Sequence, residues 1–125
     1  MPRGGNPRLS STDTKALIAQ AVERLYDEVP ALRKLQLVIR LELRARGGDV
    51  PIWRVEVPGP KITRDPAADS RIDVSVARSH FNELATDGKL EHWVGAYEHG
   101  DVKVSGDRAV LALLGNVIQR RRARV

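Results

Sequence analysis

The sequence predicts an α+β domain with a five-stranded, mostly antiparallel sheet and helices packed on one face of it. Apolar and polar residues alternate in several separate segments, which is the pattern of half-buried strands. Apolar residues recur at helical spacing in the segments before and after these strands. The polar residues of the alternating segments are mostly charged, so one sheet face should contact water while the helices cover the other.

The first helix is expected over residues 11–30. Ser11 or Thr12 can cap it, Asp13 favours the positive end of its dipole, and Pro30 closes it. Its apolar residues follow a spacing of 3.6 and form one broad face, consisting of Leu17, Ile18, Ala21, Val22, Leu25, Tyr26 and Val29.

Residues 35–46 form the longest alternating segment, and no helix places every second residue on one face. Residues 47–49, Gly-Gly-Asp, suit a hairpin turn because glycine readily adopts positive φ. Three further strands are expected at residues 51–57, 61–63 and 71–77. The charged side chains of the open face should pair across strands, with Arg40, Arg44 and Arg54 contacting Glu42, Glu56 and Asp73.

The second half of the sequence predicts two short helices, a fifth strand and a long last helix. The short helices are expected at 79–88, which ends in glycine, and at 90–100. The fifth strand is Val102–Ser105, and the last helix runs from about residue 107 to about Arg121. The expected order is therefore one helix, four strands, two helices, one strand and one helix.

The chain has 125 residues, no cysteine and a formal net charge of +5, and its excess positive charge lies near its two ends. Residues 9–119 hold 15 basic and 16 acidic residues. We expect an N-terminal arm at 1–10, a single domain at 11–119 and a basic tail at 120–125.

This distribution argues against nucleic-acid binding, which needs clustered positive charge on a folded face. Weak contact with an anionic membrane is expected instead, through Arg120, Arg121, Arg122 and Arg124. The first residues contain no apolar signal segment, and the longest apolar run has six residues, so a cytoplasmic protein is predicted.

Signals for catalysis or metal binding are weak, and we predict a non-enzyme with no cofactor, no catalytic residue and no metal ligand. Without cysteine, thiolate nucleophiles are excluded, and the Gly-x-Ser-x-Gly motif of serine hydrolases does not occur. His80, His92 and His99 are spaced by 12 and 7 residues, unlike the two histidines of a helical zinc motif.

Residues 74–114 resemble the C-terminal half of the sterol carrier protein (type two) family. In that family a short helix is followed by a Gly-Lys-Leu step, an aromatic-bearing helix, a strand ending in Gly-Asp and an apolar helix. The matching residues are Phe81, Leu84, Gly88, Lys89, Leu90, Tyr97, Gly100, Lys103, Val104, Gly106, Asp107 and Val110 to Leu114. The element order agrees over roughly residues 12–120.

The resemblance implies binding and carriage of an apolar lipid, such as a fatty acid, an acyl-CoA or a sterol-like molecule. It implies no covalent chemistry. Three features depart from the family pattern. Ala77 stands where serine is common, Glu91-His92 replaces Asp-Pro, and the middle helix has Trp93 and Tyr97 where relatives are rich in phenylalanine and methionine. The shape of any lipid tunnel is therefore open, and an interaction module of the same fold without a tunnel is the alternative.

The last helix is apolar on nearly every side between Ala109 and Leu114, which fits either a lined cavity or ordinary core packing. If a cavity lies between sheet and helices, the last helix is expected to move to admit the ligand, with Gly106 and Gly115 as the flexible positions. The predicted lining residues are Leu41, Leu43, Trp53, Val55, Val74, Phe81, Trp93, Tyr97, Val110, Leu114 and Ile118.

Overall fold

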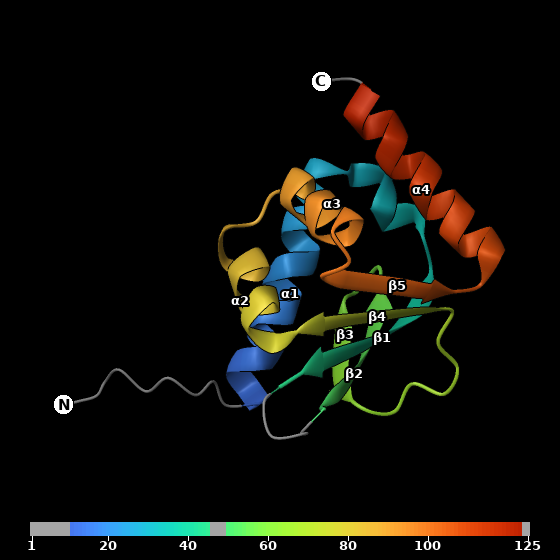
Figure 1. Cartoon of the computed structure of the whole chain (residues 1–125). Coiled ribbons are helices and arrows are strands. Elements are labelled where there is room, and N and C mark those ends of the chain that lie inside the picture. The colour runs from blue at the N-terminus through green and yellow to red at the C-terminus, as the bar shows by residue number, and fades with distance from the viewer. Residues whose placement is uncertain (1–10, 46–49, 124–125) are drawn as a thin grey trace.

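The computed structural model describes residues 11–45 and 50–123 (Figure 1). The predicted N-terminal arm, the 47–49 turn and Arg124 lie outside these residues. In chain order the elements are α1 (Ser11–Glu28), the 3-10 helix η1 (Pro30–Lys34), β1 (Leu37–Arg44), β2 (Ile52–Val57), β3 (Lys61–Arg64), β4 (Ile72–Ala77), α2 (Arg78–Asp87), α3 (Leu90–Glu98), β5 (Val102–Gly106) and α4 (Arg108–Ala123).

The five strands form one sheet in the order β3-β2-β1-β4-β5. Three neighbouring pairs are antiparallel, and the central pair β1–β4 is parallel. Helices α1, α2 and α3 lie together on one side of the sheet, while α4 leads away from the end of β5 and lies beside η1 (Figure 1). The predicted α+β fold with a mostly antiparallel sheet is confirmed.

The alternation along β1 decides which side chains enter the core. Leu41 and Leu43 are buried, while Arg40, Glu42 and Arg44 lie on the opposite, wetter face. The apolar face of α1 packs onto this region, so helix and sheet enclose a single apolar cluster. Its buried members are Ile18, Ala21, Leu41, Leu43, Trp53, Val55, Ile62, Val76, Phe81, Leu84, Ala85, Ala96 and Val102.

Two element boundaries differ from prediction in ways that matter for the site. The first strand begins at Leu37 rather than at residue 35, because η1 occupies Pro30–Lys34 and Leu35 still belongs to its end. Proline favours the first turn of a helix, so Pro30 both closes α1 and opens η1. The last helix extends beyond Arg121 to Ala123, and the first three arginines assigned to a basic tail are therefore helical.

Two arginines of the open sheet face pair with carboxylates that the prediction named, but the expectation that they do so across strands is wrong. Arg40 contacts Glu42 at 3.2 Å and Arg54 contacts Glu56 at 2.7 Å, each two residues along the same strand. Side chains at i and i+2 share one face of a strand, so neighbours along the chain are within reach. Arg54 also pairs with Asp69 at 2.7 Å, in the loop before β4.

Candidate functional site

An apolar pocket of about 90 Å³, open to the surface, lies between α1, η1, the sheet and α4. Every residue that lines it is aliphatic except one tyrosine. Helix α1 and η1 form one wall, three strands form the floor, and a single leucine of α4 closes the remaining side. The lining residues are Val22, Leu25, Tyr26, Leu32, Leu35, Leu37, Ile39, Val57, Ile72 and Leu114.

Local sequence explains why these side chains meet. Val22, Leu25 and Tyr26 stand at spacings of three and four in α1, so they share one face of the helix. Leu37 and Ile39 extend the apolar face of β1 toward the start of the strand, and Ile39 also packs against the closed core. The 3-10 turn of η1 then folds its own leucines back over this end of the strand.

Tyr26 turns its ring to the pocket wall and its hydroxyl to the backbone. The hydroxyl donates a hydrogen bond of 2.7 Å to the carbonyl oxygen of Pro58. The Arg33 guanidinium lies 5.0 Å from the ring centroid, a cation–π contact. Burial raises the pKa of the Tyr26 phenol, and the Glu23 carboxylate raises it further, while Arg33 opposes both. The phenol therefore stays neutral at physiological pH, and its polar atom has a partner away from the apolar wall.

Helix α4 is attached to the rest of the molecule mainly at its two ends. At its start, the Asp107 carboxylate accepts N–H bonds from Ala109 at 2.8 Å and Val110 at 3.2 Å, and it pairs with Arg71 at 3.0 Å. The Val110 N–H, the Arg71 guanidinium and the Ala109 N–H hold the pKa of the Asp107 carboxyl below its usual value.

At the other end of α4, Arg121 donates from Nε to the carbonyl oxygen of Glu28, the last residue of α1. Arg122 pairs with Glu91 of α3 at 3.3 Å. The Glu28 carboxylate in turn accepts the backbone N–H of Leu90, at the start of α3, at 2.7 Å. The ends of α1 and α4 and the start of α3 are thus joined by polar contacts.

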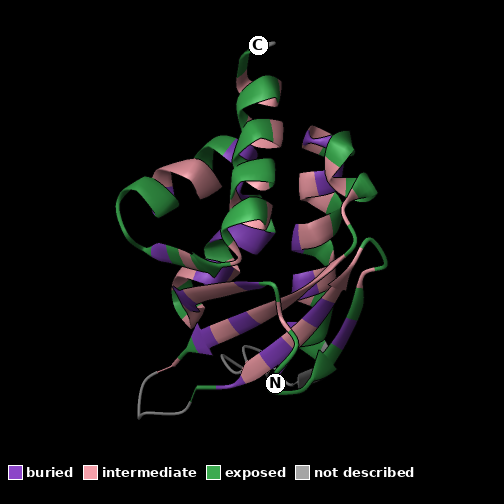
Figure 2. Cartoon of the chain, turned by 90° about the vertical axis from the view of Figure 1, so that its right-hand side faces the viewer, coloured by how far each residue is buried: buried purple, intermediate pink, exposed green. Residues whose placement is uncertain are grey.

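Between these attachments α4 packs lightly. None of its residues is fully buried by the described part of the chain, and Figure 2 shows its outer face exposed along its whole length. Val110, Leu111, Leu114, Val117 and Ile118 are half-buried, and the side chain of Leu113 is 48% exposed. Helix α4, like η1, therefore contributes no fully buried residue to the pocket wall.

The eleven side chains predicted to line a cavity differ in burial and do not share one environment. Leu41, Leu43, Trp53, Val55 and Phe81 lie inside the closed core, and Val74 and Trp93 pack against it. Tyr97 is 56% exposed, and Val110, Leu114 and Ile118 are half-buried on α4. Of these eleven, Leu114 borders the pocket in its present form.

The pocket residues that the prediction omitted come mainly from α1 and η1. Val22, Leu25 and Tyr26 were recognised as an apolar helix face, but that face has no feature that separates pocket from core. Leu32 lies in a helical segment too short to show periodicity and Leu35 follows it, so only the position of Pro30 hints at a helical turn there.

Chemically, the pocket offers apolar surface and no acid, base or nucleophile. The described residues contain no cluster of three or more potential metal ligands, and none of their helices is long and apolar enough to cross a membrane. One polar atom of the neighbouring core lacks a partner among the described residues. This atom is the buried indole nitrogen of Trp53, whose ring also lies 5.2 Å from the Arg64 guanidinium.

No family model and no curated protein matches the sequence, but solved structures match the fold. The crystal structure of sterol carrier protein 2 like 2 from Aedes aegypti aligns with a TM-score of 0.56 at 24% identity, covering 83% of this chain and 98% of that one. The chain has the fold of sterol carrier protein 2. Sterol carrier protein 2 from Yarrowia lipolytica, in its apo form, aligns with a TM-score of 0.56 at 16% identity over 78% of this chain and 87% of that one.

A third structure with the sterol carrier protein 2 fold is that of the Aedes aegypti protein in complex with palmitate, a C16 fatty acid. It aligns with a TM-score of 0.54 at 19% identity, over 82% of this chain and 90% of that one. The fold predicted from the resemblance is therefore confirmed over about four fifths of the chain.

Proposed function

We propose that this protein binds and carries an apolar lipid, with its acyl chain or ring system in the pocket between α1, η1, the sheet and α4. The observation that supports this most directly is the pocket wall, in which ten residues contribute apolar surface and the Tyr26 hydroxyl is already bonded elsewhere. Apolar surface left in contact with water is unfavourable, so an apolar occupant is the ligand that such a wall selects. The palmitate complex of a protein with this fold agrees with the proposal.

The pocket must enlarge to hold such a ligand. Its volume is about 90 Å³, whereas ligand pockets usually begin at ~300 Å³. A dry cavity of that larger size would cost about 7 kcal/mol at ~24 cal/mol per Å³, comparable to the whole stability of a small domain. We therefore expect a narrow empty state and a wider filled state. We expect outward movement of α4 between them, because α4, like η1, buries no residue fully.

The test begins with native mass spectrometry and organic extraction of freshly purified full-length protein, followed by calorimetric titration of the delipidated protein with palmitate. Leu114→Asn places an amide in the pocket wall and should reduce palmitate affinity at least tenfold. The matched control is Leu111→Asn, which makes the same change at a half-buried leucine of α4 that does not border the pocket. Circular dichroism confirms that both variants are folded.

Equal affinities of the two variants would contradict the assignment of the ligand to this pocket. Protein that carries no lipid, and shows no thermal shift with fatty acids, acyl-CoAs or sterols, would contradict lipid carriage itself. The small volume of the pocket then favours the second candidate, a protein-interaction module of the same fold. The exposed side chains of Tyr97 and Leu113 would be the apolar contacts available to its partner.

A further inference from the structure

Positive charge is concentrated on two elements of the molecule. Together η1 and α4 contain six basic residues and no acidic residue, namely Arg33, Lys34, Arg108, Arg120, Arg121 and Arg122. The other described residues hold eleven basic and fifteen acidic side chains. A protein polarised in this way has a preferred orientation next to any charged surface.

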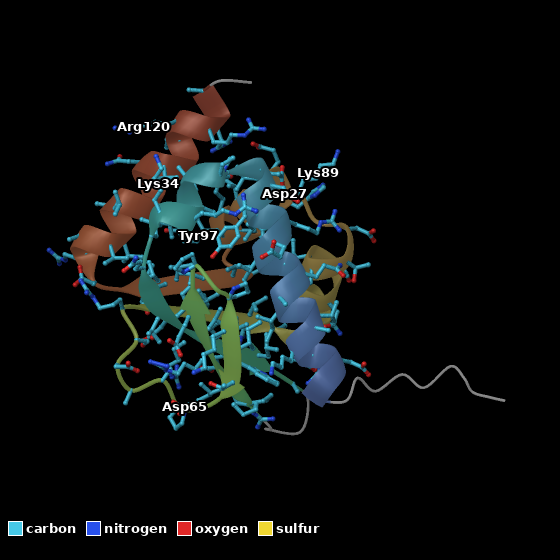
Figure 3. All side chains as sticks on the ribbon, turned by 180° about the vertical axis from the view of Figure 1, so that it is seen from behind. Asp27, Lys34, Asp65, Lys89, Tyr97 and Arg120 are labelled. Carbon is cyan, nitrogen blue, oxygen red and sulfur yellow. The ribbon has the colours of Figure 1, made fainter. Side chains whose placement is uncertain are left out.

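The two basic elements are neighbours in space although they are far apart in the sequence. Helix α4 packs on η1, and Figure 3 shows Lys34 and Arg120 on the same side of the molecule, where η1 and α4 lie next to each other. These elements also contribute Leu32, Leu35 and Leu114 to the pocket. The basic face therefore surrounds part of the pocket wall.

Four of these six positive charges are not neutralised by another described residue. Lys34, Arg108 and Arg120 are exposed and form no ion pair with another described residue. Arg121 donates to a carbonyl oxygen, which leaves its charge uncompensated.

The other two basic side chains of this face have acidic partners. Arg33 lies 3.7 Å from the Asp27 carboxylate and 4.0 Å from that of Glu23, and Arg122 pairs with Glu91. The face thus keeps a net positive charge after all its ion pairs are counted.

We propose that the η1–α4 face docks the protein on an anionic lipid bilayer. The charges are accompanied by apolar surface, since Ala109, Ala112 and the large side chain of Leu113 are exposed on α4. Basic residues beside exposed apolar ones on a helix suit the interface of a bilayer, which offers anionic headgroups and hydrocarbon together. A nucleic acid would use the charges but gain nothing from the exposed leucine and alanines.

Docking by this face would bring the pocket wall formed by η1 and α4 close to the lipid headgroups. Transfer of a lipid between bilayer and pocket rests on the proposed function, but docking itself requires only the basic face. The two can therefore fail separately, and the test of docking uses no pocket ligand.

The experiment is flotation of the full chain with vesicles of phosphatidylcholine alone and of phosphatidylcholine mixed with phosphatidylglycerol. We expect binding to the anionic vesicles only, and its loss at high salt. The double variant Lys34→Gln/Arg120→Gln should weaken partitioning by about fivefold per charge removed, hence about 25-fold. The matched control, Lys61→Gln/Lys103→Gln, removes the same charge from exposed positions on β3 and β5 and should weaken partitioning far less.

Three outcomes would overturn the proposal. Equal weakening by the two double variants would mean that net charge, rather than this face, attracts the protein. Equal binding to neutral and anionic vesicles would show that the positive charge of this face does not drive binding to the bilayer. Competition by a short double-stranded DNA at a concentration that matches the vesicle phosphate would identify a nucleic-acid surface instead.

Discussion

Replacement of Gly106 by alanine should destabilise the protein strongly, because Gly106 has a φ of +137° at the junction of β5 and α4. A Cβ atom at this position would lie 2.3 Å from the carbonyl oxygen of Arg71 and 3.0 Å from the Cα of Ile72. The first contact is with backbone, so no side-chain rotation relieves it. A non-glycine residue in such a conformation costs ~1–3 kcal/mol from backbone strain alone.

Relief of this contact must also separate β4 from β5, since Ile72 and Gly106 are register partners at the edge of the sheet. We therefore expect Gly106→Ala to lower the free energy of unfolding by about 3 kcal/mol and the melting temperature by about 10 °C. Urea unfolding followed by circular dichroism measures the first quantity, and a thermal scan measures the second.

Two other glycines provide internal controls, because their replacement by alanine should raise the free energy of unfolding instead of lowering it. Gly95 in α3 and Gly115 in α4 are both helical, and a Cβ atom at either position would have no neighbouring atom within 4 Å. Alanine at either position should raise the free energy of unfolding by about 0.5–1 kcal/mol, because alanine loses less backbone entropy in a helix. The reasoning is refuted if Gly106→Ala unfolds within about 0.5 kcal/mol of the parent protein while the two controls behave as expected.

Three further predictions follow from the burial and hydrogen bonding of single side chains. Leu43→Ala should lower the free energy of unfolding in urea by about 4 kcal/mol and Leu114→Ala by only about 1 kcal/mol, because the first leucine is fully buried and the second half-buried. Similar losses for the two variants would show that α4 packs more tightly than described. Tyr26→Phe should lower the free energy of unfolding by about 1 kcal/mol, because it removes the hydrogen bond from the hydroxyl to a backbone carbonyl. An unchanged free energy in urea unfolding would contradict the presence of that hydrogen bond. The Asp107 carboxyl has a lowered pKa in the folded protein, so its stabilisation of α4 is present above about pH 4 and is lost as the pH falls through that lowered pKa. Protection factors of the α4 amides, which correct for the intrinsic pH dependence of hydrogen exchange, should fall over this range in the parent but not in Asp107→Asn.

Much of the fold could be predicted because its signals are local. The period of two in residues 37–44 specifies a strand with one buried face, whatever the strand pairs with. The spacing of apolar residues in α1 and the glycine at position 88 likewise depend only on neighbours along the chain. The element order and the existence of one covered sheet face followed from these patterns.

Which part of the covered sheet face is buried in the core, and which part borders the pocket, could not be predicted in the same way. Leu37, Ile39, Leu41 and Leu43 are equivalent in the sequence, since all four lie on the same side of one strand. In the structure the last two are buried in the closed core, and the first two form part of the pocket floor. The difference arises from which elements cover each part of the strand, since α1, η1 and α4 border the pocket, and alternation contains no information on that.

The sequence by itself therefore determined the order of the strands and longer helices, though not η1, and which face of each is apolar, because those properties depend on contacts within a few residues. Only the tertiary structure decided where the apolar faces meet and where they leave a pocket, and which arginines near the C-terminus have partners. Arg121 reaches the end of α1 and Arg122 reaches α3, across separations of 93 and 31 residues. Contacts over such separations depend on the packing of whole elements, which no local pattern of residues records.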